Sequence, residues 1–298
     1  MRGTKRFKTA SILLILLILL IIPFESMEAE GPLRIAITPV LPEGHLEPNR
    51  EMINYIGDRI ERSAELVQRR SYQEINDLLQ KGEVDVAFVG GVTYILGRDK
   101  SAMELLVAPV VFDESTNYFS YLVVRKDSPI RSLLDLKGKR FAFTDPLSTS
   151  GKLLPAYLLA RINETPETFF KKYIYTYSHS SSIEAVSVGL VDGASVDSYI
   201  WDFLSSKDPE SVSRLKIIER HELIGTTPVV VRNDIEPGLK ERLRRVFLDM
   251  ERDQRGREIL NKMGIKRFVD VKDSIYNATR EMFKFVERRT DPGRKKKR

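Results

Sequence analysis

Hydrophobic positions alternate along the chain between short continuous runs and stretches in which apolar residues recur at helical spacing. Continuous apolar runs of about four to eight residues are typical of strands that are buried on both faces. We therefore expect strands at Leu33–Thr38, Val84–Val89, Leu105–Val111, Tyr118–Val124, Phe141–Phe143, Tyr173–Tyr177, Gly193–Val196, Leu215–Ile218 and Val229–Val231.

Stretches with helical spacing fill the intervals between these runs. Pro48 and Asn49 mark a helix start before Met52–Leu66, and Gly82 marks the stop after Tyr72–Gln80. We expect helices over 52–66, 72–80, 151–162, 183–190, 238–250, 253–263 and 273–288. Strands that alternate with helices predict an α/β fold, with parallel sheets covered by helices on both faces.

Two similar apolar segments lie about 100 residues apart, Tyr121–Pro129 (YLVVRKDSP) and Pro228–Ile235 (PVVVRNDI). Each runs from an apolar strand into Arg, a further polar residue and Asp. A chain that leaves one lobe, builds a second and returns needs two crossing strands of this kind. The alternative is that the two strand ends are unrelated.

The first 29 residues have the composition of an export signal. Basic residues within 2–8 precede the apolar run 11–22 (SILLILLILLII), which Pro23 ends. The run is shorter than the roughly 20 residues that span a bilayer as a helix. Cleavage near Ala29 and an uncleaved N-terminal anchor both stay open, and both place the fold in the periplasm or another extracytoplasmic space. No cysteine follows the run, which excludes lipoprotein anchoring.

Composition and charge narrow the function classes. With 42% hydrophobic and 30% charged residues over 298 positions, the chain is neither disordered nor a polytopic membrane protein. The absence of cysteine excludes disulfides, thiol catalysis and zinc–thiolate sites. The net charge of +6 divides into +2 in residues 1–29, −2 in 30–287 and +6 in the basic tail 288–298, so we expect no nucleic-acid partner. For the tail, a solvated end is favoured over contact with anionic lipid headgroups.

The segment 141–155 (FAFTDPLSTSGKLLP) carries the strongest candidate chemistry. A strand ends, Asp-Pro turns, and Ser148, Thr149, Ser150 and Gly151 lead into a helix. Three hydroxyls, the free N–H groups of a helix start and the helix dipole all favour an anion there. The alternative is an ordinary Ser/Thr cap. The residue order of a phosphate-binding P-loop, GxxxxGK followed by Ser or Thr, is absent.

His179, in YTYSHSSSIEAV, lies between a predicted strand and a helix, where its ring can donate to an anion or simply cap the helix. Tyr72 and Tyr118 are candidate cleft donors, although tyrosines in such places more often belong to the core or rim. We interpret Asp145 and Asp197 as structural. The chain has no HExxH, GxSxG or GxGxxG pattern, so we expect no catalytic residue, no metal site and no cofactor.

These residues resemble a known family. The run 145–155 (DPLSTSGKLLP) is similar to the DPxSTSGxxxP motif of phosphonate/phosphite/phosphate-type periplasmic substrate-binding proteins of ABC transporters. The segments 71–90, 117–143 and 178–198 resemble that family as well, and together the similar segments extend over most of residues 33–232.

The resemblance implies a periplasmic-binding-protein type II fold. Two Rossmann-like lobes would be joined by two crossover strands, with the ligand cleft between them. The expected division is signal or anchor 1–29, lobe 1 from 32–124 plus 230–287, lobe 2 from 125–229, and tail 288–298.

The resemblance also assigns roles at the cleft. Ser148, Thr149 and Ser150 would hold the oxyanion oxygens, helped by the N–H groups of Ser150 and Gly151. His179 would donate from the same lobe. Tyr72 and Tyr118 would approach from the first lobe and the crossover.

The implied function is capture of phosphate, phosphite or an alkylphosphonate by cleft closure, in a monomer that serves an ABC permease. The alternative is a sensor of the same fold that signals to a membrane partner such as a histidine kinase. An enzyme is disfavoured. In the aminoalkylphosphonate branch, acidic side chains receive the ligand's amine, but Tyr199 and Thr227 stand at those positions here. The alternative is that a shift of two residues brings the Asp197 carboxylate to one of these positions. As the residues stand, the departure favours a smaller ligand without an amine.

Overall fold

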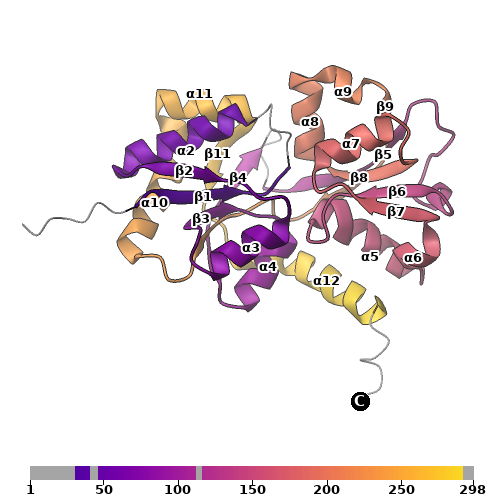
Figure 1. Cartoon of the computed structure of the whole chain (residues 1–298), viewed down its shortest axis with the longest axis horizontal. Helices are drawn as coiled ribbons and strands as arrows, with labels where there is room; N and C mark the ends of the chain where they lie inside the picture. Colours follow the sequence, from indigo (N-terminus) through magenta and orange to yellow (C-terminus); the bar gives the residue numbers. More distant parts are fainter. Residues whose placement is uncertain (1–30, 41–45, 112–115, 291–298) are drawn as a thin grey trace, which may run out of the picture. The chain divides into compact units, whose positions relative to one another are not determined.

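The computed structural model describes residues 31–40, 46–111 and 116–290, and the chain from Pro32 onward forms one compact unit. The predicted signal (1–29) and the tail beyond residue 290 lie outside the described residues. None of the helices in these ranges is both long and apolar enough to cross a membrane. The described chain builds two sheets, each with its own helices (Figure 1).

The first sheet has six strands in the order β11-β4-β10-β3-β1-β2. Its strands are β1 (Leu33–Ile37), β2 (Ala64–Val67), β3 (Val86–Phe88), β4 (Met103–Val111), β10 (Val229–Arg232) and β11 (Ile265–Val269). Its helices are α2 (Glu47–Ile60), α3 (Tyr72–Gln80), α4 (Gly91–Asp99), α10 (Pro237–Asp249) and α11 (Gln254–Met263). We call these elements the first lobe.

The second sheet has five strands in the order β7-β6-β8-β5-β9. Its strands are β5 (Tyr118–Arg125), β6 (Arg140–Phe143), β7 (Lys172–Tyr175), β8 (Gly193–Asp197) and β9 (Leu215–Leu223). Its helices are a π-helical turn at Thr149–Leu153, α5 (Leu154–Arg161), α6 (Pro166–Phe169), α7 (His179–Ser187), α8 (Ser198–Lys207) and α9 (Pro209–Ser213). We call these elements the second lobe.

The chain passes between the lobes twice, from β4 to β5 and from β9 to β10. The two similar segments of the sequence supply β5 and β10, and each of these strands runs antiparallel to both of its neighbours. The prediction of parallel sheets is therefore wrong for β5 and β10, because these strands enter from the other lobe and not through a helix that covers their own sheet. The predicted lobe boundary at residue 124 placed β5 in lobe 1, but its pairing with β8 and β9 puts it in the second sheet. The remaining predicted domain boundaries stay predictions.

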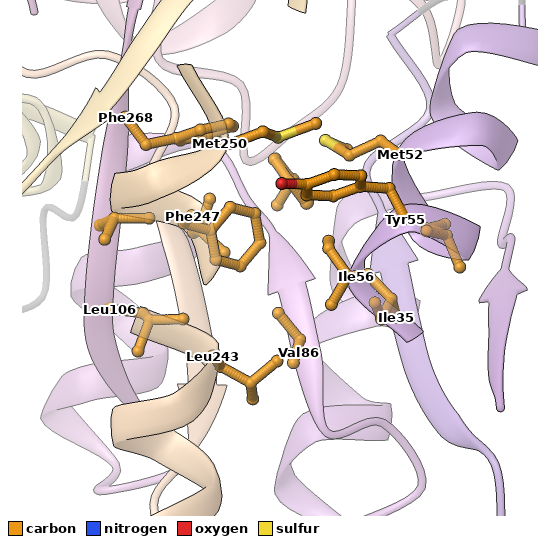
Figure 2. Packing of buried hydrophobic residues seen from close by; sticks show 14 of the residues in the cluster. Ile35, Met52, Tyr55, Ile56, Val86, Leu106, Leu243, Phe247, Met250 and Phe268 are labelled. Carbon is orange, nitrogen blue, oxygen red and sulfur yellow. The ribbon is translucent and has the colours of Figure 1, made fainter. Parts of the chain in front are cut away.

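The central strands of the first sheet are buried on both faces because their side chains alternate between two apolar clusters. Ile35 and Val86 face a cluster formed with α2 and α10 (Figure 2). Ala36 and Ala87, one residue further along each strand, face the cluster with α3 and α4. The continuous apolar runs predicted as strands thus come from burial on two sides.

Several elements differ from the predicted ones. The helix expected over 52–66 ends at Ile60, where Glu61 adopts a left-handed backbone with φ 58°, and 64–67 form β2. α4, α6, α8, α9 and β11 were not predicted. α4 (GVTYILGRD) carries two glycines and β-branched residues, so its helix depends on packing more than on propensity.

The C-terminal helix α12 (Asn277–Thr290) contacts α4 of the first lobe and α5 of the second. The rings of Phe285 in α12 and Tyr157 in α5 meet edge to face with centroids 5.3 Å apart. Just before α12, the Tyr276 hydroxyl donates to the carbonyl of Thr226 at 2.9 Å, in the segment that returns to the first lobe. The segment from Tyr276 through α12 thus contacts both lobes.

Candidate ligand-binding site

The loop from Ser148 to Gly151 follows β6 and opens the π-helical turn before α5. The Ser148 hydroxyl accepts a hydrogen bond from the Gly151 N–H at 2.9 Å, so it caps this turn. All four residues of the loop are buried. The carbonyl of Ser150 accepts from the hydroxyls of Ser120 at 2.9 Å and Ser195 at 2.7 Å, which fixes the loop to β5 and β8.

Two helix starts of the first lobe meet this loop. The Val92 N–H in the first turn of α4 donates to the Thr149 hydroxyl oxygen at 3.1 Å. The Tyr72 N–H in the first turn of α3 donates to the Asp145 carboxylate at 3.1 Å. Both donors are first-turn N–H groups that have no acceptor within their own helix. The lobes are therefore in direct contact at the predicted site.

Tyr72 and Tyr118 are both buried, with 2% and 6% of their surface exposed. Burial raises the pKa of the Tyr72 phenol well above its usual value, while a hydrogen bond with Ser148 acts in the opposite direction. Burial likewise raises the pKa of Tyr118, against hydrogen bonds with Thr149 and Ser150. Both phenols thus stay protonated and can donate. The structure brings both predicted tyrosines to the loop.

His179 is the first residue of α7, and Ser178 caps the helix by accepting from the Ser181 N–H at 3.0 Å. The imidazole is therefore not the cap. Its Nδ1 accepts from the Asp197 N–H at 3.1 Å, so the proton of the neutral ring lies on Nε2. Burial lowers the pKa of His179 to about 3, which keeps the ring neutral at physiological pH.

Asp197 caps α8 by accepting from the Tyr199 N–H at 2.8 Å, which agrees with the predicted structural role. Its other carboxyl oxygen lies 3.5 Å from the Ser150 hydroxyl. Burial raises the pKa of this carboxyl to about 7. Asp145 is buried as well, and it accepts from the N–H groups of Leu147 and Tyr72, which again is a structural role.

A cavity of about 70 Å³ lies between the lobes and reaches Asp197. This volume is far below the roughly 300–1,000 Å³ of pockets that hold drug-sized ligands. Its lining is mostly apolar: Ile37, Thr38, Val40, Asn49, Phe88, Pro109, Val111, Asp197, Tyr199, Ile200, Thr226, Thr227, Met263 and Ile265. Asp197 connects the cavity to the serine loop, because it contacts Ser150 and also lines the cavity.

Apart from Tyr72, sequence reasoning missed the first-lobe part of this site. The start of α4 contributes a backbone N–H, and the only sequence signal for it is the Gly90–Gly91 pair after a predicted strand. Met263 reaches the cavity from the end of α11, far from any motif. Within the described ranges, no group of three or more acidic or histidine side chains is arranged to hold a metal ion.

Comparison with known proteins identifies relatives of the chain. The model of a family described as the phosphonate periplasmic substrate-binding protein of ABC transporters matches residues 35–276. The phosphonates-binding periplasmic protein of Escherichia coli K12 is 30% identical over 197 residues, which is 65% of this chain and 58% of that protein. A probable phosphite-binding protein of Prochlorococcus marinus is 27% identical over 218 residues, 67% of this chain and 71% of that protein. The alignment thus spans less than two thirds of the Escherichia coli protein.

Solved structures show the same fold. The binding-protein component of a Pseudomonas aeruginosa phosphonate transporter superposes with a TM-score of 0.82 at 25% identity, over 87% of both chains. A Prochlorococcus marinus protein in complex with methylphosphonate gives 0.78 at 20% identity, over 86% of this chain and 98% of that one. An ancestral arginine-binding protein, at 18% identity, still gives 0.59, over 79% of this chain and 99% of that one. The predicted two-lobed binding-protein fold is confirmed.

Proposed function

Because the chain belongs to the phosphonate-binding family of periplasmic substrate-binding proteins of ABC transporters, we propose that it captures a small phosphorus oxyanion and delivers it to an ABC permease. The family binds substrates and does not transform them, which agrees with the predicted absence of catalytic residues. The proposed ligands are phosphate, phosphite and short alkylphosphonates.

One observation carries the proposal: uncharged donors gather at the serine loop. Ser148, Thr149 and Ser150 supply hydroxyls, and His179 supplies a neutral imidazole N–H. The protonated phenols of Tyr72 and Tyr118 contact the same loop. A buried oxyanion is stable only if most of its oxygens find such donors. The near-neutral fold offers little long-range attraction, so local donors must supply the affinity.

The lobe contacts support capture by closure. The bonds from Val92 to Thr149 and from Tyr72 to Asp145 join the lobes beside the proposed oxyanion position. A ligand that accepts hydrogen bonds from both lobes stabilises this closed arrangement over an open one, because in the open cleft the first-lobe donor lies away from the ligand.

The cavity supports a small ligand without an amine. Its wall is mostly apolar, and Tyr199 and Thr227, which line it, carry no charge. Asp197 is the only acidic residue in the lining that could pair with an ammonium group, and burial already favours the neutral form of that carboxyl. We therefore expect methylphosphonate, phosphite or phosphate to bind more tightly than 2-aminoethylphosphonate.

Calorimetric titration of residues 30–298, which contain the compact unit, tests this proposal. Phosphate, phosphite, methylphosphonate and 2-aminoethylphosphonate are titrated in turn, with sulfate as the control anion. We expect at least one of the three amine-free phosphorus ligands to bind more tightly than sulfate and 2-aminoethylphosphonate. Failure of every phosphorus ligand to bind overturns the ligand class.

A second measurement tests delivery. A sensor of this fold would bind the same ligand, so binding alone does not distinguish uptake from sensing. We expect deletion of the gene to abolish uptake of the radiolabelled ligand at micromolar concentration. Unchanged uptake in the deletion strain contradicts the transport role.

A further inference from the structure

Tyr199 forms a hydrogen bond between the lobes that uses none of the proposed ligand donors. It lies in the first turn of α8 in the second lobe, and its hydroxyl donates to the carbonyl of Met263 in the first lobe at 2.7 Å. Met263 is the last residue of α11, and the last carbonyls of a helix lack hydrogen-bond donors within it. The Tyr199 hydroxyl therefore satisfies a helix-end carbonyl of the opposite lobe.

The Tyr199 hydroxyl keeps its proton at every physiological pH, so it can always donate this bond. Burial raises the pKa of the Tyr199 phenol, and the nearby Asp197 carboxyl acts in the same direction. The phenol thus keeps its proton, and a neutral O–H···O=C bond in a water-poor cleft is stronger than the same bond in water.

The two other hydrogen bonds described above between the lobes, from Val92 and from Tyr72, involve elements of the proposed ligand site. The bond from Val92 ends on Thr149, and the bond from Tyr72 holds the helix that carries the Tyr72 ring. Both elements would also touch the ligand, so both contacts respond to its arrival. The bond from Tyr199 to Met263 involves only the far wall of the cavity.

The Tyr199 ring also limits the space next to the oxyanion. Tyr199 and Met263 both line the 70 Å³ cavity, and Asp197 joins this cavity to the serine loop. We expect a substituent on the phosphorus atom to extend into this cavity, whose other walls include packed apolar residues such as Phe88 and Ile265.

We propose that Tyr199 is a latch that holds the two lobes closed over the ligand, and that its ring sets the greatest length of the ligand's substituent. The second half of this proposal rests on the proposed function, whereas the latch itself does not. The latch raises the affinity for every ligand by the same factor, since it stabilises the closed state whatever occupies the cleft. The ring acts differently, because it discriminates between short and long substituents.

Two substitutions separate these effects. Tyr199→Phe removes the hydroxyl and keeps the ring, so we expect phosphate, methylphosphonate and ethylphosphonate to bind about 2- to 10-fold more weakly, by a common factor. Tyr199→Ala removes the ring as well, so we expect propyl- and butylphosphonate to gain at least about 10-fold relative to methylphosphonate. Tyr173→Phe is the matched control, because the Tyr173 hydroxyl also donates at 2.7 Å, to Glu167, but within the second lobe and away from the cavity.

A measurement without ligand tests the latch alone. Small-angle scattering of the unliganded protein should give a larger radius of gyration for Tyr199→Phe than for the wild type and Tyr173→Phe. An unchanged radius overturns the latch. An unchanged order of alkylphosphonate affinities in Tyr199→Ala overturns the role of the ring. If the wild type binds no phosphorus ligand, the proposed function fails, while the scattering result still decides the latch.

Discussion

The two lobes contribute different chemistry to the cleft. The second lobe supplies side-chain donors on a loop that its own strands hold in place, through the bonds from Ser120 and Ser195 to the Ser150 carbonyl. The first lobe contributes the Tyr72 ring and first-turn N–H groups of two helices, which donate to the second lobe at Val92 and Tyr72. We propose that the second lobe thus holds a preformed half-site, which the first lobe completes on closure. The ligand should therefore meet the second lobe first.

The preformed half-site depends most strongly on Gly151. A Cβ on this residue would lie 2.6 Å from the Cβ of Thr144, beneath the loop. We expect Gly151→Ala to displace the serine loop, to abolish detectable binding, and to lower the free energy of unfolding by about 1–3 kcal/mol. Calorimetry and urea unfolding measure the two effects. Gly31→Ala is the control, because its added Cβ meets open space. Wild-type affinity in Gly151→Ala would show that the loop is not the half-site.

The next largest effect is expected at Thr149, which serves both lobes. Its hydroxyl can donate to the oxyanion while its oxygen accepts from Val92. Hydrogen bonds to charged groups contribute about 1.5–3 kcal/mol, so Thr149→Ala should weaken binding by about 10- to 100-fold. Thr149→Ser keeps the hydroxyl and should stay within a few-fold of the wild type. Equal losses in both variants would mean that the methyl group, and not the hydroxyl, carries the effect.

The contrast between the lobes also explains what the sequence could predict. The second-lobe half of the site could be predicted from the sequence because its donors are side chains. They lie in short segments that follow strands, at Ser148–Gly151 and at His179. Apart from the Tyr72 ring, the first lobe contributes backbone N–H groups, and no residue type indicates these. The start of α4 was missed for this reason, and because two glycines lower its helix propensity.

Tertiary contacts between segments that are distant in sequence could not be predicted from the sequence either. The bond from Tyr199 to Met263 joins residues 64 positions apart, and neither lies in a motif that pairs them. The alternation of strands and helices predicted most strands of both sheets. It predicted β5 and β10 as strands but not their antiparallel direction, because local hydrophobicity carries no information about the direction from which a strand enters its sheet. β2 was missed because its pattern continues that of α2.

The pH dependence of the free energy of unfolding tests whether burial keeps two second-lobe groups, His179 and Asp197, neutral. The pKa of His179 falls from 6.5 to about 3, so its contribution to stability is present above pH 6.5 and is lost as the pH falls toward 3. The pKa of Asp197 rises from 3.8 to about 7, so its contribution is present below pH 3.8 and is lost as the pH rises through 7. Between about pH 4 and 6.5 the two groups therefore act in opposite directions.

Two variants separate these contributions. As the pH falls from 6.5 to 4, His179→Gln should gain stability relative to the wild type, and Asp197→Asn should lose it. Each slope should reach at most about 1.4 kcal/mol per pH unit. Urea unfolding at half-unit pH steps measures both slopes. Slopes of the same sign would contradict the proposed burial of one of the two groups.

The smallest effect is expected at Tyr72, the first-lobe side chain of the site. Tyr72→Phe removes one donor that arrives only on closure, so we expect a loss of about 2- to 5-fold in affinity. Because the ligand meets the second lobe first, this loss should appear in the dissociation rate, with the association rate unchanged. Stopped-flow kinetics measures both rates, with Tyr55→Phe, in the first-lobe core, as the control. If Tyr72→Phe slows association as strongly as Thr149→Ala does, the first lobe takes part in the initial encounter, and the half-site is not preformed in the second lobe alone.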